Sequence, residues 1–264
     1  MKDFTITHIG DTALSLPMPF KYIPAKGKTF MFQADVGLNV VSKGNLIPIT
    51  FNRDFWICVY LTTQEFWVEG VKEISSKDLK YYPSFHKGKI RPVENVSWDD
   101  IQIFNKGLNY LLKNRRIIVN DNPQIISQFG LPSETQWSYA AAADQNTSYA
   151  GSDRLDDVGW YVKNSNGQTM PVGLKQPNAW GLYDLNGNVW EWCADNYNPK
   201  ASEIPINGTP NLKKAKSKVI RGGSFLNGDM VQTHRFSGLD CDPQLSSSSI
   251  GFRLIFSTYD EKML

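Results

Sequence analysis

The chain has 264 residues, 41% of them hydrophobic, and a formal net charge of +2 from 28 Lys and Arg against 26 Asp and Glu. This composition excludes a disordered chain, and the length lies near the upper end for one domain. Balanced and scattered charge argues against nucleic acid as a partner. Three cysteines without a CxxC pair, Cys58, Cys193 and Cys241, predict neither a disulfide framework nor a zinc site.

The first 15 residues mix Lys with Asp and lack the continuous apolar stretch of a secretory signal. The sequence contains no run of about 18 apolar residues, which is the length that a membrane-spanning helix needs. We therefore expect no membrane partner and a location in the cytoplasm or in a phage particle. Because no linker rich in Pro, Gly or Ser splits the chain, we expect an N-terminal lead-in over residues 1–26 and one domain over 27–264.

The first half of the chain predicts one strand and three helices. The apolar run Phe55 to Tyr60 indicates a strand, and a short helix is expected from Thr63 to about Val68. A longer helix begins at Ser97, because Ser97 and Asp100 have capping-box spacing and apolar residues then recur every three or four positions. Another begins at Ser133, with Gln136 as its capping partner.

From residue 151 onward, Gly, Pro, Asn, Ser and Asp interrupt the chain every few residues, which predicts loops and short strands held by buried aromatic side chains. Trp180 to Asp195, WGLYDLNGNVWEWCAD, predicts a tight turn covered by aromatic rings. Its acids Asp184 and Glu191 could bind a hard cation such as calcium. The alternative is that both acids cap backbone amides, and the residues taken alone favour this alternative.

Two later apolar runs predict core strands: Val219 to Phe225, VIRGGSF, and Ile250 to Phe256, IGFRLIF. Each run contains one arginine, Arg221 and Arg253 respectively. An arginine inside a buried strand needs partners, so we expect buried ion pairs or carbonyl contacts that hold loops, and no catalytic role.

Together these motifs resemble the formylglycine-generating enzyme, or sulfatase-modifying factor, domain. The resemblance rests on WGLYDLNGNVWEWCAD, RGGSF and GFRL, and extends over most of the chain, from about Phe30 to Phe256. Further segments agree with it: Phe55 to Phe66, PVENVSW at Pro92 to Trp98, LPSETQWSYAAA at Leu131 to Ala142, and TMPVG at Thr169 to Gly173.

The resemblance implies an α+β fold akin to C-type lectins, with two main helices on a twisted antiparallel sheet and little regular secondary structure. It also implies one calcium ion, held by side chains and carbonyls of four residues: Asp184, Gly187, Val189 and Glu191. A second calcium site of some members begins with an Asn where this chain has Val158, so that site is expected to be absent.

The catalytic positions of the family differ here. In formylglycine-generating enzymes a cysteine pair that binds copper follows the GGS-aromatic strand by two and seven residues, where this chain has Asn227 and Gln232. Two amides cannot replace two thiolates as ligands of a soft cuprous ion, so copper is not expected. Related iron enzymes use clustered histidines, whereas His8, His86 and His234 lie far apart in sequence, so iron is not expected either.

The stretch between the last two motifs, residues 226–249, predicts an irregular loop on a rigid scaffold. In lectin-like relatives, including the variable proteins of diversity-generating retroelements and phage or surface adhesins, this region forms the ligand-binding face. We expect a protein or small-molecule ligand at this face, with eight candidate contact residues: Phe225, Asn227, Asp229, Gln232, His234, Arg235, Phe236 and Asp240.

Three functions remain open at this stage. The first is a ligand-binding, non-copper member of the family, which keeps the fold without the chemistry. The alternative is an oxidoreductase or protein-modifying enzyme that uses other residues of the same face, such as Cys241, His234, Arg235 or Asp240. The third is a structural component of an assembly that contacts neighbouring chains through residues 1–26 and 246–249.

Overall fold

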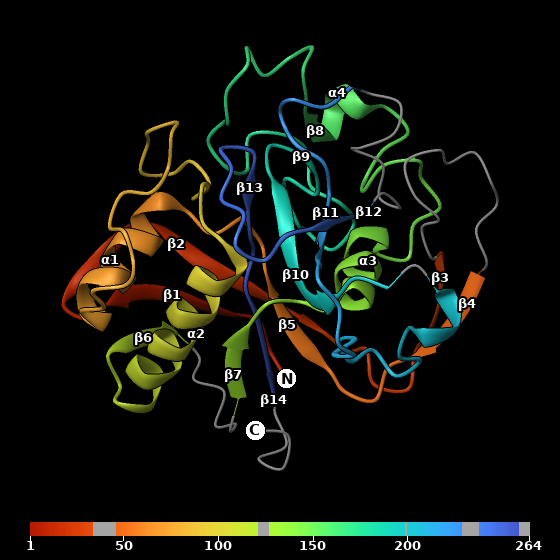
Figure 1. Cartoon of the computed structure of the whole chain (residues 1–264), viewed down its shortest axis with the longest axis horizontal. Coiled ribbons are helices and arrows are strands. Elements are labelled where there is room, and N and C mark those ends of the chain that lie inside the picture. Colours follow the sequence, from red (N-terminus) through yellow and green to blue (C-terminus); the bar gives the residue numbers. More distant parts are fainter. Residues whose placement is uncertain (34–45, 121–126, 199, 229–237, 259–264) are drawn as a thin grey trace.

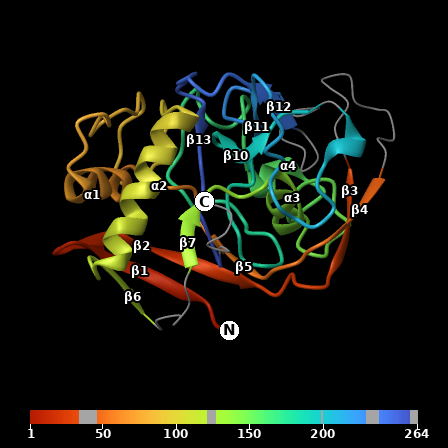
Figure 2. The same cartoon turned by 60° about the horizontal axis from the view of Figure 1, so that its bottom comes forward.

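The computed structural model describes residues 1–33, 46–120, 127–198, 200–228 and 238–258. A six-stranded antiparallel sheet has the order β6-β1-β2-β5-β14-β7. Its strands are β1 (Phe4–Ile9), β2 (Thr12–Ile23), β5 (Phe55–Cys58), β6 (Ile117–Asn120), β7 (Ser127–Gly130) and β14 (Ile255–Thr258). Figure 2 shows β1, β2, β5 and β6 of this sheet along the lower side of the molecule.

A second sheet of four strands has the order β12-β11-β10-β13, and only its β10–β13 pair is parallel. Two short ribbons, β3–β4 and β8–β9, complete the strands of the described residues. Their bounds are β3 (Thr29–Gln33), β4 (Leu46–Thr50), β8 (Gly159–Trp160), β9 (Asn186–Gly187), β10 (Trp190–Asn196), β11 (Lys218–Arg221), β12 (Gly238–Cys241) and β13 (Ile250–Gly251).

Four α-helices occur in the described part of the chain: α1 (Gln64–Ile74), α2 (Trp98–Lys113), α3 (Glu134–Ala142) and the single turn α4 (Leu155–Val158); Ala201–Glu203 forms a 3-10 turn. In Figures 1 and 2, α1 and α2 lie together at one end of the molecule, and α3 and α4 lie toward the other. None of these helices has the length and apolar character needed to cross a lipid bilayer. The architecture confirms the predicted α+β class.

The predicted helix starts are confirmed. Ser97 and Ser133 each accept a hydrogen bond from the amide three residues on, and Asp100 and Gln136 return the bond to the capping amide. The helix predicted to end near Val68 is longer, because α1 continues to Ile74. Gly70 does not end it, since the missing side chain makes room for the Phe104 ring of α2, which would lie 2.6 Å from an added Cβ.

The first 26 residues are an integral part of the fold rather than a separate lead-in. β1 and β2 form an antiparallel hairpin, and β2 pairs with β5 near the middle of the six-stranded sheet. Phe4 and Phe20 from this hairpin are buried and stack with ring centroids 4.8 Å apart. The boundary expected at residue 26 therefore does not divide the sheet or the core.

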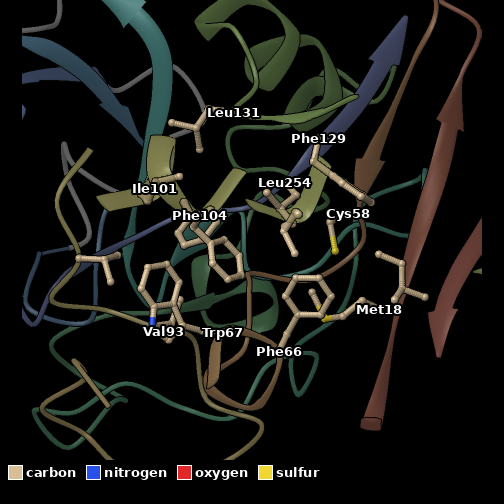
Figure 3. Packing of buried hydrophobic residues seen from close by; sticks show 14 of the residues in the cluster. Met18, Cys58, Phe66, Trp67, Val93, Ile101, Phe104, Phe129, Leu131 and Leu254 are labelled. Atoms are coloured by element: carbon tan, nitrogen blue, oxygen red, sulfur yellow. The ribbon is translucent and has the colours of Figure 1, made fainter. Parts of the chain in front are cut away.

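The largest core cluster lies between the sheet and the helices α1 and α2. Trp67 of α1 stacks on Phe104 of α2 at 4.5 Å, and both rings meet Phe252 edge-on at 6.2 Å. Figure 3 shows Trp67 and Phe104 converging with residues of the sheet, including Met18 and Cys58. Burial of so many large apolar side chains is the main stabilising contribution to this fold.

The two predicted core strands are shorter than expected, and each change has a local cause. β11 ends at Arg221 because Gly222 and Gly223 have φ of +95° and +77°, which a regular strand does not accommodate. The run Ile250 to Phe256 is split, since β13 belongs to the four-stranded sheet and β14 to the six-stranded one. Residues 252–254 thus carry the chain from one sheet to the other.

Candidate functional site

The turn predicted in WGLYDLNGNVWEWCAD is present, and several of its residues have left-handed backbone. Asp184, Gly187 and Asn188 have φ of +58°, +97° and +63°. Gly187 cannot be replaced without strain, because an added Cβ would lie 2.0 Å from the carbonyl oxygen of Trp160. The turn is therefore fixed against β8 by backbone contact.

Two asparagines tie this turn to neighbouring loops. Asn188 accepts from the Met170 amide at 3.0 Å and donates to the Met170 carbonyl at 3.1 Å. Asn186 makes the same pair of bonds with Ala150, at 2.9 and 3.0 Å. These bonds hold residues 150 and 170 in place around the turn.

The four residues predicted to hold calcium lie in this turn and at the start of β10. Glu191 is fully buried and forms a bidentate pair with Arg253, with Oε2 to Nε at 2.6 Å and Oε1 to Nη2 at 2.9 Å. Asp184 accepts from the Gly173 amide at 2.8 Å. Capping of a backbone amide thus occurs at Asp184, whereas Glu191 has an arginine partner.

The charges of these groups do not balance. Two buried carboxylates, Asp184 and Glu191, face one buried guanidinium, that of Arg253. Burial raises the pKa of Asp184 to about 6, although the Gly173 amide and Arg253 act in the opposite direction. A carboxylate oxygen that accepts one hydrogen bond retains a lone pair for a cation. The donor set therefore fits a divalent cation that supplies the missing positive charge.

The described residues contain no group of three or more His, Cys, Asp or Glu side chains that could hold a metal ion. The predicted calcium set has only two acids and relies on the carbonyls of Gly187 and Val189 for its other ligands. Such a mixed set is typical of calcium, which accepts carbonyl and carboxylate oxygens together. The set contains no thiolate or imidazole, the ligands on which cuprous and non-haem iron sites depend.

Both strand arginines have the structural contacts predicted for them. Arg253 donates to the carbonyls of Cys58, Val59 and Tyr183 at 3.2, 3.3 and 2.8 Å, besides its pair with Glu191. Arg221 is fully buried, lies 3.5 Å from Glu134 and donates to the Ser138 hydroxyl at 3.0 Å. Arg253 thereby connects β5, the turn at Tyr183 and β10.

Only part of the predicted ligand-binding face lies within the described residues. Phe225 is buried and Asn227 is half-buried, while the backbone of Asp240 pairs with Val219 in the β11–β12 ladder. The other five predicted contact residues lie outside the described residues: Asp229, Gln232, His234, Arg235 and Phe236.

Asn227, at the first family cysteine position, closes a turn. Its side-chain oxygen accepts from the amide and from the hydroxyl of Ser224, both at 2.8 Å. Its own carbonyl accepts from the Val162 amide at 3.0 Å. The side chain therefore clamps the loop after RGGSF and joins it to the loop after β8.

A neighbouring loop, residues 84–94, was not identified from the sequence as part of the site. His86 packs edge-on against Phe225, with ring centroids 5.1 Å apart. Its amide donates to the fully buried Glu94 at 2.8 Å. Burial raises the pKa of Glu94 to about 7, and burial with the nearby Arg91 lowers the pKa of His86. The only sequence signal was PVENVSW, which contains Glu94.

The three cysteines are buried and form no disulfide. Burial raises the pKa of Cys58 to about 12 and that of Cys193 well above its ordinary value. Because the thiolate is the reactive form, neither Cys58 nor Cys193 is a suitable nucleophile in this structure. Cys241 lies in β12, opposite Lys218.

Comparison with known proteins gives a consistent family. The family model described as sulfatase-modifying factor enzyme 1-like domain matches residues 28–258. The formylglycine-generating enzyme of Streptomyces coelicolor is 33% identical over 180 residues, which cover 61% of this chain and 51% of that protein. Chaperone protein LppX of Paenibacillus barcinonensis is 32% identical over 180 residues, 53% of this chain and 61% of that protein.

A mouse protein named inactive C-alpha-formylglycine-generating enzyme 2 is 27% identical over 179 residues, 61% of this chain and 48% of that protein. The matches thus span about half to three fifths of the length of these curated relatives. Among solved structures, Treponema denticola variable protein 1 superposes with a TM-score of 0.76 at 24% identity, covering 96% of this chain and 98% of that one. PvdO from Pseudomonas aeruginosa gives 0.72 at 22% identity with the same coverage. At these identities the structures share the fold.

Proposed function

This chain belongs to the sulfatase-modifying factor enzyme 1-like domain family, and from that premise we propose that it is a binding module that presents residues 226–249 to a protein or small-molecule ligand. The observation that carries the proposal is the role of Asn227. The position that holds a copper-binding cysteine in formylglycine-generating enzymes is here an amide whose oxygen accepts two bonds from Ser224. The Asn227 side chain therefore stabilises the conformation of the loop that follows RGGSF.

The surrounding scaffold supports the same proposal. The loop after RGGSF is held by the contact of Asn227 with Val162 and by the bond from the Ser165 hydroxyl to the Phe225 carbonyl at 3.0 Å. Phe225 is further packed against His86. A segment whose entry is fixed in this way can offer a preorganised surface, which lowers the entropic cost of binding.

We propose calcium as the structural ion of this scaffold, held by Asp184, Gly187, Val189 and Glu191. The support is the uncompensated negative charge of the two buried acids. Calcium would neutralise that charge and hold the turn, whose Gly187 amide donates to the Gly222 carbonyl and whose Asn188 carbonyl accepts from the Phe225 amide. In this proposal the ion has no part in chemistry, and neither copper nor iron is required.

A matched pair of substitutions tests the calcium site. Asp184→Asn should abolish the rise in melting temperature that calcium gives to the chelator-treated protein. Asp195→Asn is the control, because Asp195 is equally buried at 3% exposure, has a pKa raised to about 6 and accepts two backbone amides outside the site. It should lower stability and keep the calcium response. Equal responses in both variants would contradict the assignment.

Binding is tested with two defined probes: an array of immobilised glycans and a phage-displayed library of random 12-residue peptides. The intact protein should select ligands from one of them, and His234→Ala with Phe236→Ala should weaken that binding at least tenfold. Failure of both probes, or binding indifferent to these substitutions, would contradict the proposal. Oxygen consumption with a thiol-containing peptide would instead favour the enzymatic alternative.

A further inference from the structure

Three described loops contribute exposed apolar side chains to one region around Phe225. Phe85, Leu174, Leu226 and Val162 are 73%, 60%, 54% and 51% exposed, and Ile90 is 39% exposed. We use the name loop surface for these five residues together with the Lys and Arg side chains of the same three loops. In Figure 1 its loops, which follow α1, β8 and β11, lie along the upper edge of the molecule.

Hydrogen bonds and ring contacts join these loops. The Val172 amide donates to the Ile90 carbonyl at 2.9 Å, which connects the first loop to the second. The Val162 amide donates to Asn227, which connects the second to the third. The rings of Phe85 and Phe225 both pack edge-on against His86, at 5.0 and 5.1 Å. These contacts hold the three loops that carry the exposed apolar side chains next to one another.

The loop surface is also basic. Residues 80–93, 159–183 and 222–228 contain no Asp or Glu, yet they carry Lys80, Lys87, Lys89, Arg91, Lys163 and Lys175. Acids of adjacent elements offset part of this charge: Glu65 of α1 lies 3.5 Å from Lys89, and α4 contributes Asp156 and Asp157. Lys89 stays 77% exposed, so its charge faces solvent.

Buried donors beside these loops lack acceptors in the described part of the chain. They are Nη1 of Arg91 and Nε1 of Trp160, and the hydroxyl of Thr169 also has no partner there. An unpaired buried donor is costly, so these three groups lower the stability of the loops that carry them. Glu94 Oε2 is an unpartnered acceptor in the same region, and its raised pKa of about 7 limits its negative charge near neutral pH.

We propose that the loop surface docks an acidic polypeptide segment that carries aromatic or branched aliphatic side chains. This inference rests on the proposed binding function and names the class of partner. The apolar side chains supply contact area, and the cations select carboxylates. Nucleic acid would satisfy the cations but leave Leu174, Leu226 and Val162 without suitable partners, because aliphatic groups do not stack on bases as aromatic rings do.

The test uses the full chain and the phage-displayed library of random 12-residue peptides. Selected peptides should combine Asp or Glu with Phe, Trp, Leu or Ile. Their affinity, measured by fluorescence anisotropy, should fall at least tenfold in Phe85→Ser and in Leu226→Ser. Leu212→Ser is the matched control, because Leu212 is 70% exposed on a segment held at the far end of β10 by the Asn211 carbonyl.

Charge is tested in the same assay. Lys89→Glu should weaken peptide binding, and added salt should reduce the difference in affinity between this variant and the wild type. The control is Lys214→Glu, which changes an exposed lysine beside Leu212 and should leave the affinity unchanged. Equal melting temperatures of all variants would show that the fold is retained. Selection of neutral or basic peptides, or affinity unchanged by Phe85→Ser, would overturn the inference.

The outcomes separate this inference from the proposed function. Peptides could bind the His234→Ala and Phe236→Ala variants more weakly but bind Phe85→Ser normally. That result would support the proposed binding function and overturn the loop surface as the docking site. Loss in Phe85→Ser and Leu226→Ser with acidic peptides would support the inference. A fluorescent single-stranded 20-nucleotide DNA that competes for the same residues would overturn the choice of polypeptide.

Discussion

Glu191 and Arg253 lie 62 residues apart in sequence and form a fully buried bidentate pair. The sequence indicated that Arg253 needs a buried partner, because an arginine within an apolar strand cannot remain unpaired. It did not identify that partner, since the family resemblance placed Glu191 at the calcium site. Both contacts are compatible with one carboxylate, which has more than two acceptor positions.

Arg253→Met should destabilise the protein by about 3 to 5 kcal/mol, because it leaves Glu191 buried without its cation. Urea denaturation in the presence of chelator measures the loss without a contribution from calcium. The double variant Glu191→Gln with Arg253→Met removes both charges and should recover part of the stability. A double variant no more stable than Arg253→Met would contradict this explanation.

Glu94 should make stability depend on pH in an unusual direction. Burial raises its folded pKa from 4.5 to about 7, partly offset by the His86 amide. Between these values the folded protein keeps a proton that the unfolded chain has lost, so the free energy of unfolding falls as pH rises. Allowing for partial solvent screening, the loss is about 1 to 2 kcal/mol.

Glu94→Gln isolates this effect, because Asp184 and Asp195 titrate in the same range in both proteins. The amide keeps an oxygen that can accept from His86. The stability of the wild type relative to Glu94→Gln should therefore decrease from pH 4.5 to 7 in urea titrations. A constant difference over that range would show that Glu94 is ionised throughout the folded protein.

At the scale of elements, helix starts were predictable and helix ends were not. Ser97 and Ser133 were identified with their capping partners because both sides of a capping box are encoded within four residues. The end of α1 depends on Ser75, which has left-handed backbone with φ of +54°. Serine gives little signal for that conformation, and Gly70 within the helix is explained only by its contact with Phe104.

Ser97→Ala should lower the free energy of unfolding by about 1 kcal/mol, because the Asp100 amide loses its acceptor at the start of α2. Ser97→Asp supplies another acceptor and is the matched control, so its stability should lie closer to that of the wild type. The comparison requires only urea titrations of the three proteins. Equal loss in both variants would indicate that packing of Ser97, rather than capping, determines its contribution.

At the scale of the molecule, residues 1–26 show what sequence patterns leave out. Strand pairing in a sheet depends on partners distant in sequence, and the partners of β2 are β1 and β5. Local pattern could not reveal that Phe4 and Phe20 complete the core shared with Trp56 and Phe256. The same limit applies to the site, where His86 meets Phe225 from a loop 139 residues away.

Phe20→Ala should therefore destabilise the whole protein by about 3 to 5 kcal/mol, as expected for a fully buried aromatic side chain. Lys21→Ala on the same strand is the control, because Lys21 forms only an exposed pair with Asp3 at 3.1 Å and should contribute under about 1 kcal/mol. Thermal unfolding should remain one cooperative transition in both. Separate melting of the N-terminal hairpin in Phe20→Ala would contradict an integral role.

We propose that this chain keeps the scaffold of its family as a binding module without copper chemistry. Elemental analysis of the purified, untagged protein, combined with its melting temperature before and after chelation, tests this most directly. We predict about one calcium per chain, neither copper nor iron, and a lower melting temperature after chelation. Copper or iron near one per chain would contradict the account and direct attention to Cys241 and His234.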